Sequence, residues 1–399
     1  MTQTTDPSGY PLASLKVLDF SRVLAGPFAS RMLADLGADV VKVEPPDGDI
    51  TRLWGRVVAN LPGYYHQQNL GKRNLCIDMQ QEGARELVFA LVEQADILIE
   101  NFRPDVMSRL GIDYDTLSKI NPRLIMLSIS GFGSGGPESH RPAYAPIVHA
   151  ESGLLARQAR RGNTPFRDLP LSVADTNASL HGLVGLLAAV IQREQTGVGQ
   201  HVEVAMIDAT VATDDQLQYD LEDSEDTGPL PNDIWQTGAG WALISADFRH
   251  LWRMLLSEHA LADPTHKTME LSEKIRLRRA RVGEFLATLE TWDEVEAVMG
   301  KMNVAWGRVR EPSELREQPT IAARETIVDV DNRAGGVRPV TRSPYRFSKA
   351  TSGIRGPAPH RGEHNSAVLH DWLSLSAEQI GDLRTSGVLL ADAPNAADV

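Results

Sequence analysis

Along the first half of the chain, segments with the apolar pattern of buried strands alternate with segments that have the apolar spacing of helices. Short apolar runs, each typical of a buried strand, occur at residues 15–21, 38–44, 96–102, 123–132 and 199–208. Apolar residues at helical spacing occur between them, at residues 26–37, 81–95 and 175–194, with short helices expected around 105–120. Strands that alternate with helices in this way predict an α/β fold with a doubly wound parallel sheet and right-handed crossovers.

The pattern changes after residue 220. Residues 221–233 are acidic and rich in turn formers, which indicates a boundary, and residues 234–330 mix short strands with charged helices. The chain has 399 residues, more than the ~250–300 that a single core usually serves. We therefore expect a large Rossmann-like domain built from 1–220 and 331–399, and a smaller α+β domain at 221–330.

Composition narrows the class of protein. The formal net charge of −13 argues against a nucleic-acid partner, because such binding depends on phosphate neutralisation. The single cysteine, Cys76, excludes an internal disulfide and fits a reducing compartment. The N-terminal residues lack the basic-then-apolar pattern of a signal peptide, and no apolar run approaches the ~18 residues of a membrane span. We expect a cytoplasmic protein with no membrane partner.

Asp175 stands at the start of the apolar stretch VADTNASLHGLVGLLAAV (173–190). Its carboxylate has three possible roles: an N-cap for the helix, a metal ligand, or a nucleophile in a site that excludes water. An N-cap is chemically sound, since the side chain can accept from the free N–H groups of the first turn. His181, two turns later, is expected to be a packed core histidine.

Other motifs are informative mainly because they lack a feature that a known cofactor or metal site requires. The first turn, RVLAGPFAS, holds one glycine, so it does not match a dinucleotide-binding fingerprint. The glycine-rich segment 130–137 lacks the lysine of a P-loop, which favours a flexible loop after a strand, with a loop that lines the ligand crevice as the alternative. HRGEH (360–364) has the spacing of a zinc motif but follows SGIRGPAP, so we expect a turn and no metal. Five basic residues near strand ends and turns suit an anionic cofactor: Arg22, Lys72, Arg73, Arg103 and Arg109.

Several segments together resemble the family III CoA transferases, the group that includes formyl-CoA transferase. They are residues 16–52, 69–79, 96–111, 174–206 and 356–365, and the resemblance is strongest over 15–210. It implies an interlocked homodimer in which each subunit is threaded through the other. It also implies coenzyme A or acyl-CoA as a substrate, with no permanently bound cofactor.

The resemblance carries site residues over by position. Asp175 aligns with the catalytic aspartate of the family, and Tyr144 would approach the thioester. The adenine and phosphate region would be lined by Val23, Leu24, Ala25 and Gly26. The CoA phosphates and ribose would be held by Lys72, Asn101, Phe102 and Arg109. Backbone N–H groups of TGAGW (237–241) are candidates for stabilising an oxyanion.

The chemistry implied is transfer of CoA between an acyl-CoA and a carboxylic acid through a thioester on Asp175. The related α-methylacyl-CoA racemases pair this aspartate with a histidine at the position of Tyr144, and tyrosine is a poor base at neutral pH. A transferase is therefore favoured over a racemase, with a non-catalytic acyl-CoA-binding protein as a third possibility. Two positions depart from the family: Ala145 replaces an acid found in many transferases, and Pro45 replaces a CoA-contacting arginine of formyl-CoA transferase.

Overall fold

The computed structural model describes residues 9–224 and 232–392, which form two compact units. The large unit comprises the described parts of 1–215 and 324–399, and the small unit those of 216–323. The sequence prediction set the boundaries at 220 and 331. Most of the predicted boundary segment, 225–231, lies outside the described residues, as do the first eight residues of the N-terminal stretch.

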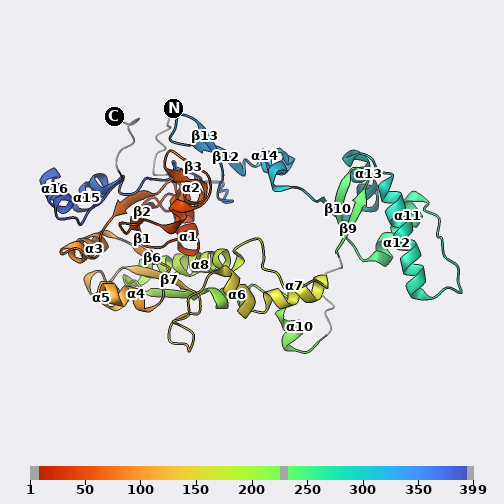
Figure 1. Ribbon diagram of the computed structural model, residues 1–399, viewed down its shortest axis with the longest axis horizontal. Helices are drawn as coiled ribbons and strands as arrows, with labels where there is room; N and C mark the ends of the chain where they lie inside the picture. The colour runs from red at the N-terminus through yellow and green to blue at the C-terminus, as the bar shows by residue number, and fades with distance from the viewer. Residues whose placement is uncertain (1–8, 225–231, 393–399) are drawn as a thin grey trace. The chain divides into compact units, whose positions relative to one another are not determined.

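A six-stranded parallel sheet forms the centre of the large unit, with the strand order β5-β2-β1-β6-β7-β8 (Figure 1). Its strands are β1 (Lys16–Asp19), β2 (Asp39–Glu44), β5 (Arg73–Cys76), β6 (Ile97–Glu100), β7 (Ile125–Ser130) and β8 (His201–Ala205). Five of them lie within the predicted ranges, and the predicted parallel α/β sheet is confirmed. The prediction missed β5. The strand order reverses between β1 and β6, so the carboxyl ends of these two strands flank a crevice where α/β proteins commonly bind ligands.

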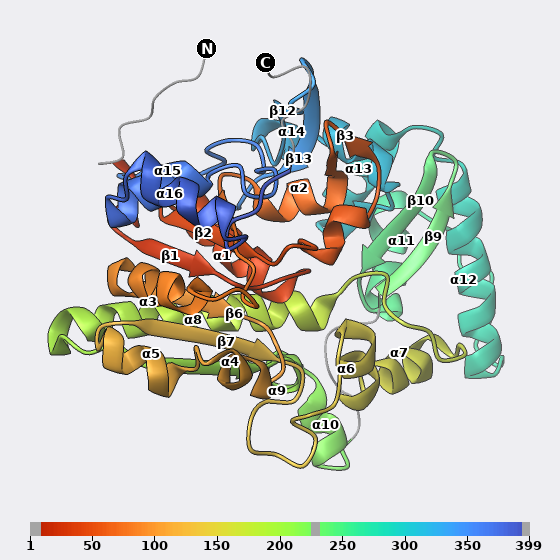
Figure 2. The same cartoon turned by 60° about the vertical axis from the view of Figure 1, so that its left-hand side comes forward.

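Helices cover both faces of this sheet (Figure 2). On one face α1 (Ala25–Asp35) packs against α8 (Val173–Thr196), and on the other α3 (Ala84–Gln94) packs against α5 (Tyr114–Ile120) and α15 (Asn365–Leu373). Successive residues of a strand enter opposite cores: Val17 belongs to the α1 side and Leu18 to the α3 side. A sheet buried on both faces explains why its strands read as continuous apolar runs.

Helix α8 is, by length and composition alone, the one described helix that could cross a membrane. The expectation that no segment approaches this size is therefore wrong. Its buried face, which includes Ala178, Leu183 and Leu186, packs against β7, β8 and α1. Gly182 brings its backbone close to the sheet, where a Cβ would meet Leu127 at 3.2 Å. These contacts are those of a core helix.

Shorter elements complete the large unit. They are η2 (Ile50–Leu53), β3 (Val57–Val58), β4 (Leu61–Pro62), α2 (Gly63–Asn69), α4 (Asp105–Leu110), α6 (Ala145–Glu151), α7 (Leu154–Gly162), α9 (Met206–Ala212), β12 (Ile327–Asp331), β13 (Val337–Thr341) and α16 (Ala377–Thr385). Helix α2 and the turn before α6 follow no strong hydrophobic period, yet both contribute residues to the site described below.

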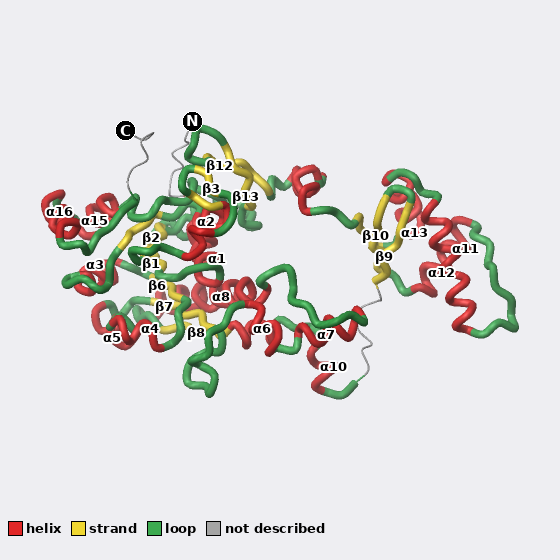
Figure 3. Tube along the Cα trace, in the orientation of Figure 1, coloured by secondary structure: helices red, strands yellow, loops and turns green. Residues whose placement is uncertain are grey.

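The small unit is an antiparallel sheet with helices gathered on one side of its hairpin (Figure 3). It contains α10 (Leu217–Leu221), β9 (Asn232–Thr237), β10 (Gly240–Ser245), α11 (Phe248–His259), α12 (Leu271–Ala287), α13 (Trp292–Met302), β11 (Ala305–Arg308), η3 (Pro312–Glu317) and α14 (Pro319–Ala323). One core joins the sheet to the helices, with Trp252, Leu255, Leu286 and Met299 buried in it.

Candidate active site

A cavity of about 520 Å³ opens at the carboxyl ends of β1, β2, β5 and β6. Its apolar wall comprises Phe20, Val43, Ile77, Phe102, Val106 and Leu110, and residues 44–49 form part of its rim. The cavity therefore lies at the point where the strand order reverses, as expected for a ligand site in a doubly wound sheet. A flat apolar slot of this kind suits a nucleobase.

Arg22 is the exposed cation of this cavity among the described residues that line it. Its guanidinium carbon lies 5.5 Å from the centre of the Phe102 ring. Lys42 also lines the cavity, but its side chain is fully buried, with an ion pair to Asp49 at 3.1 Å and a hydrogen bond to the Ser21 carbonyl. An anionic ligand would therefore meet Arg22 first.

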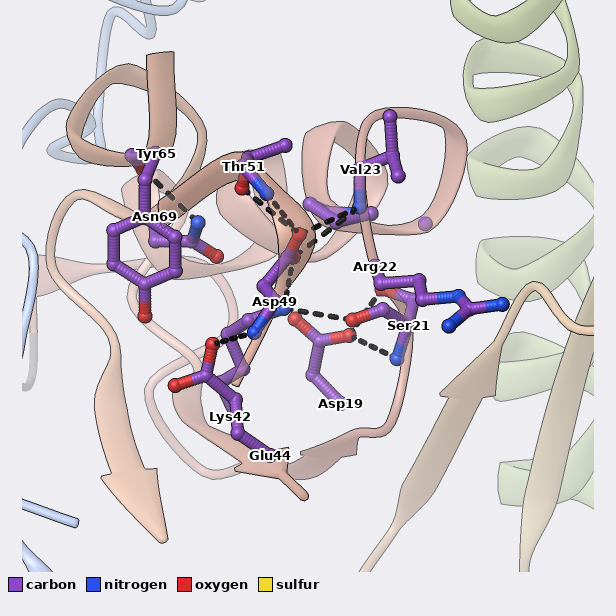
Figure 4. Close-up of polar contacts among 12 residues, drawn as sticks. Asp19, Ser21, Arg22, Val23, Lys42, Glu44, Asp49, Thr51, Tyr65 and Asn69 are labelled. Carbon is purple, nitrogen blue, oxygen red and sulfur yellow. Dashed lines mark hydrogen bonds and ion pairs between the residues drawn. The ribbon is translucent and has the colours of Figure 1, made fainter. Parts of the chain in front are cut away.

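The first turn holds an unusual backbone conformation at Val23, whose φ is +66°. This region is unfavourable for a β-branched residue. The N–H of Val23 donates to both carboxylate oxygens of Asp49, at 3.3 and 3.2 Å. Asp49 is buried, and it also pairs with Lys42 and accepts from Thr51 (Figure 4). Burial alone would raise the pKa of Asp49, but these partners outweigh it and lower that pKa.

Asn101 joins the end of β6 to the same turn. Its side-chain oxygen accepts from the Arg22 N–H at 2.8 Å, and its amide donates to the Arg22 carbonyl at 2.8 Å. The side chain is thereby committed to positioning the turn. Gly26 packs so closely against the turn that a Cβ would lie 2.1 Å from the Cβ of Ser21. Leu24 and Ala25, which lie between Val23 and Gly26 in the chain, are buried.

Lys72 does not reach the cavity. Its ammonium is fully buried and donates to Asp19 at 2.9 Å, to the Pro27 carbonyl at 3.1 Å and to Asn69 at 2.8 Å. All three donors of the ammonium are used. Burial opposes ionisation of Asp19, yet the charges of Lys72 and Lys42 lower the pKa of Asp19 to about 2. The contact of Lys72 with a CoA phosphate stays a prediction; in this structure the ammonium binds Asp19 and the Pro27 carbonyl of α1.

Among the other predicted basic residues, Arg103 and Arg109 are exposed and Arg73 is partly buried. Arg109 pairs with Asp105 on α4 at 3.2 Å and directly precedes the cavity-lining Leu110. Arg73 is held by ion pairs to Asp39 and to Asp371. The structure therefore brings only Arg22 of the predicted basic cluster into the cavity wall.

Asp175 lies in the first turn of α8, which begins at Val173 after the N-cap residue Ser172. The reading of Asp175 as the N-cap is therefore wrong. The side chain is 9% exposed, and the backbone N–H groups of Ala145 and Ala25 are among the influences that lower the pKa of its carboxylate. Ala25 is the first residue of α1 and Ala145 the first of α6.

The starts of α1, α6 and α8 therefore meet at this carboxylate, and helix N-termini favour an anion. Burial nevertheless raises the pKa of Asp175 to about 6, and His149, followed by the N–H groups of Ala145 and Ala25, limits that rise. The segment 22–25 connects this carboxylate to the cavity, since Arg22 lines the cavity wall and the Ala25 N–H acts on Asp175.

Two tyrosines accompany Asp175. Tyr144 is the N-cap residue of α6 and is 63% exposed, immediately before the Ala145 N–H. The sequence analysis did not identify Tyr64 of α2. Burial, and then the charges of Asp175 and Asp49, raise the pKa of Tyr64 to about 12. Ala145 is buried, so a carboxylate in its place would lie beside Asp175 and repel it.

Three further expectations can be compared with the structure. The TGAGW segment forms the β9–β10 turn, and the N–H groups of Gly238 and Ala239 donate to the carbonyls of Leu286 and Leu289. These two N–H groups are therefore used within the small unit, and the role of the segment as an oxyanion site stays a prediction. His181 is exposed rather than packed in the core. HRGEH forms a turn that precedes α15, as expected.

Comparison with known proteins adds sequence and structural relatives. Residues 12–365 match CoA-transferase family III. The acetyl-CoA:oxalate CoA-transferase of Acetobacter aceti is 42% identical, over 95% of this chain and 100% of that protein. The succinate–glutarate CoA-transferase of Agrobacterium fabrum is 32% identical, over 90% and 95%. A crystal structure of a CAIB/BAIF family protein from Brucella suis aligns with a TM-score of 0.78 and 30% identity, over 91% of this chain and 100% of that one.

Proposed function

The chain belongs to CoA-transferase family III, and we propose that it transfers CoA from an acyl-CoA to a carboxylic acid through a thioester on Asp175. The observation that carries this proposal is the buried Asp175 carboxylate in the first turn of α8, whose pKa is lowered by the N–H groups that begin α1 and α6. A carboxylate that forms covalent intermediates must be ionised to attack and shielded from water that would hydrolyse them. The N–H groups support the first requirement and burial the second.

The reaction proceeds by four exchanges. The Asp175 carboxylate attacks the carbonyl of the donor thioester, the C–S bond breaks, and a mixed anhydride and CoA thiolate form. The thiolate then attacks the aspartyl carbonyl of the anhydride, which releases the donor acid and leaves an aspartyl-CoA thioester. The acceptor carboxylate attacks this thioester and regenerates the thiolate. Finally the thiolate attacks the acceptor's acyl carbon, forming the new acyl-CoA and freeing Asp175; no net proton is consumed.

The N–H groups of Ala25 and Ala145 suit the charge that develops in these steps. Each tetrahedral intermediate places a negative charge on an oxygen bonded to the attacked carbon, and fixed donors in a site that excludes water stabilise it strongly. Both N–H groups act on the Asp175 carboxylate and lower its pKa. They serve the two steps in which the aspartyl carbonyl is attacked.

The cavity beside β1 and β6 is the proposed CoA site. Its apolar wall accepts the adenine ring, and Arg22 meets the phosphates. From Arg22 the turn leads through Val23 to Ala25, so a pantetheine arm that follows this turn ends at Asp175. Phe102, shared between the cavity wall and the Arg22 contact, fixes the orientation of the base.

We further propose a short dicarboxylic acid as the acceptor. The relatives that match at 42% and 32% identity act, by their names, on oxalate and on succinate and glutarate. Acetyl-CoA with oxalate is the first pair to assay, and succinyl-CoA with glutarate is the second. If the protein turned over neither pair but did transfer CoA to a monocarboxylic acid, that result would contradict the proposed acceptor class.

The active protein is proposed to be a homodimer, interlocked as the family resemblance implies. Helix α8 exposes three large apolar side chains along one stripe, Leu180, Val184 and Ile191, with exposed fractions of 45%, 69% and 63%. A stripe of this kind commonly marks a protein interface. Light scattering after size exclusion should give twice the chain mass for the wild type. A monomer at assay concentration that retains full activity would refute the dimer.

Comparison of the wild type with Asp175→Ala tests the transferase. The variant should bind acyl-CoA but transfer no CoA, while the wild type exchanges CoA between the acids. Incorporation of deuterium at the α-carbon in heavy water, without acid exchange, would instead indicate a racemase. Acyl-CoA binding by both proteins with no turnover by either would indicate a binding protein.

A further inference from the structure

His149 lies one helical turn after Ala145 in α6, and its side chain is fully buried. Helix α6 packs against α8, and the His149 imidazole faces the start of α8.

Two hydrogen bonds define the state of the His149 ring. Nδ1 lies 2.9 Å from Oδ1 of Asp168, and Nε2 lies 3.2 Å from the backbone N of Ala174. The Ala174 N–H can only donate, so Nε2 must be an unprotonated acceptor. Nδ1 then carries the proton and donates it to Asp168, which fixes the tautomer and the ring orientation.

Ala174 directly precedes Asp175 and is the second residue of α8. Its N–H is one of the four at a helix start that have no partner within the helix. Ser172, the N-cap residue, makes no side-chain cap bond. The imidazole therefore takes the place of a local cap and ties the first turn of α8 to α6.

We propose that His149, oriented by Asp168, is a positioning residue that holds Asp175 in its reactive geometry. The bond from the Ala174 N–H to His149 Nε2 ties the backbone next to Asp175 to α6. The inference rests on the proposed function, because the geometry it preserves is that of the nucleophile. His149 touches neither substrate nor the reacting oxygen, so it acts only through α8.

The test compares steady-state kinetics of His149→Ala, His149→Gln and Asp168→Ala with the wild type. In His149→Ala, kcat should fall about 10²-fold, the loss that a displacement of about 1 Å in a reacting group produces. KM for acyl-CoA should stay unchanged, because the CoA cavity is elsewhere. The glutamine Oε1 can accept from the Ala174 N–H, so His149→Gln should recover most of kcat.

Asp168→Ala keeps the ring but removes the group that fixes its tautomer. Asp168 is 42% exposed, so this substitution leaves the core intact. With ¹⁵N-labelled histidine, the wild-type His149 should show a protonated Nδ1 and an unprotonated Nε2, and Asp168→Ala should show a mixture of tautomers. His370→Ala is the matched control, since His370 forms a similar contact with Asp371 at the surface; it should match the wild type throughout.

Several results would overturn the inference. If His149→Ala kept the wild-type kcat, or if His149→Gln were as impaired as His149→Ala, the positioning role would be excluded. A wild-type ring protonated at Nε2 would exclude the bond to Ala174. Asp175→Ala is assayed alongside: its full activity would overturn the proposed function itself. An inactive Asp175→Ala combined with a fully active His149→Ala would overturn only the positioning role.

Discussion

Substitution of Asp175 by asparagine should change how the stability of the protein depends on pH. Burial raises the pKa of Asp175 from 3.8 to about 6 in the folded protein, while the unfolded chain keeps the ordinary value. The folded state therefore binds more protons than the unfolded state between these two pH values, so this group makes the protein less stable as pH rises. Asparagine does not titrate, so the variant lacks this loss.

The size of the effect follows from the pKa difference. A rise from 3.8 to about 6 corresponds to about 3 kcal/mol once pH is well above 6. Linkage places about 1 kcal/mol of this below pH 4.5, so about 2 kcal/mol accumulates between pH 4.5 and 7.5. The weaker interaction of a neutral amide with the N–H groups of Ala25 and Ala145 adds a nearly constant offset, which does not change the slope.

Urea unfolding of the wild type and Asp175→Asn at a series of pH values measures this difference. The wild-type free energy of unfolding should fall relative to that of the variant by about 2 kcal/mol between pH 4.5 and 7.5. Relative to the wild type, the inactive variant should therefore be more stable at pH 7.5 than it is at pH 4.5. Parallel pH profiles for the two proteins would refute the claim that burial makes ionisation of Asp175 unfavourable in the folded protein.

Three further substitutions have separate expected outcomes. Arg22→Ala should raise KM for acyl-CoA about tenfold, equivalent to about 1.4 kcal/mol, and flatten its salt dependence; unchanged KM would place the phosphates elsewhere. Lys72→Met leaves Asp19 buried without its partner and should cost about 3–5 kcal/mol in urea unfolding; a loss of CoA affinity with normal stability would restore the phosphate role. Gly26→Ala forces a Cβ against Ser21, so it should lower the unfolding free energy by about 1–3 kcal/mol and reduce kcat, whereas a neutral result would contradict the tight turn.

The hydrophobic pattern predicted most of the parallel sheet, because strands buried on both faces leave an uninterrupted apolar signal. It missed β5, whose first two residues are polar for tertiary reasons. Arg73 pairs with Asp39, and Asn74 donates to Glu44 on the neighbouring strand. No local period reports such partners, since they come from other parts of the chain.

The candidate site was predictable only where a residue's role follows from its place in the chain. The position of Asp175 at the start of a helix was visible in sequence, but the helix begins three residues earlier than an N-cap role requires. Lys72 follows a glycine, and the sequence therefore predicted a surface charge available to a ligand. Its burial against Asp19 depends on the whole sheet, which the local sequence does not report. His149 belongs to no motif, and its importance emerges only from two bonds to distant residues.

Chemical trapping of the enzyme tests the central claim most directly. The protein is mixed with acyl-CoA in the absence of an acceptor acid, quenched with hydroxylamine, digested and analysed by mass spectrometry. The account predicts a hydroxamate on Asp175 in the wild type, which depends on acyl-CoA and is removed by adding the acceptor acid before the quench. An enzyme that turns over the same acyl-CoA while Asp175 stays unmodified, or carries the adduct on another side chain, would contradict it.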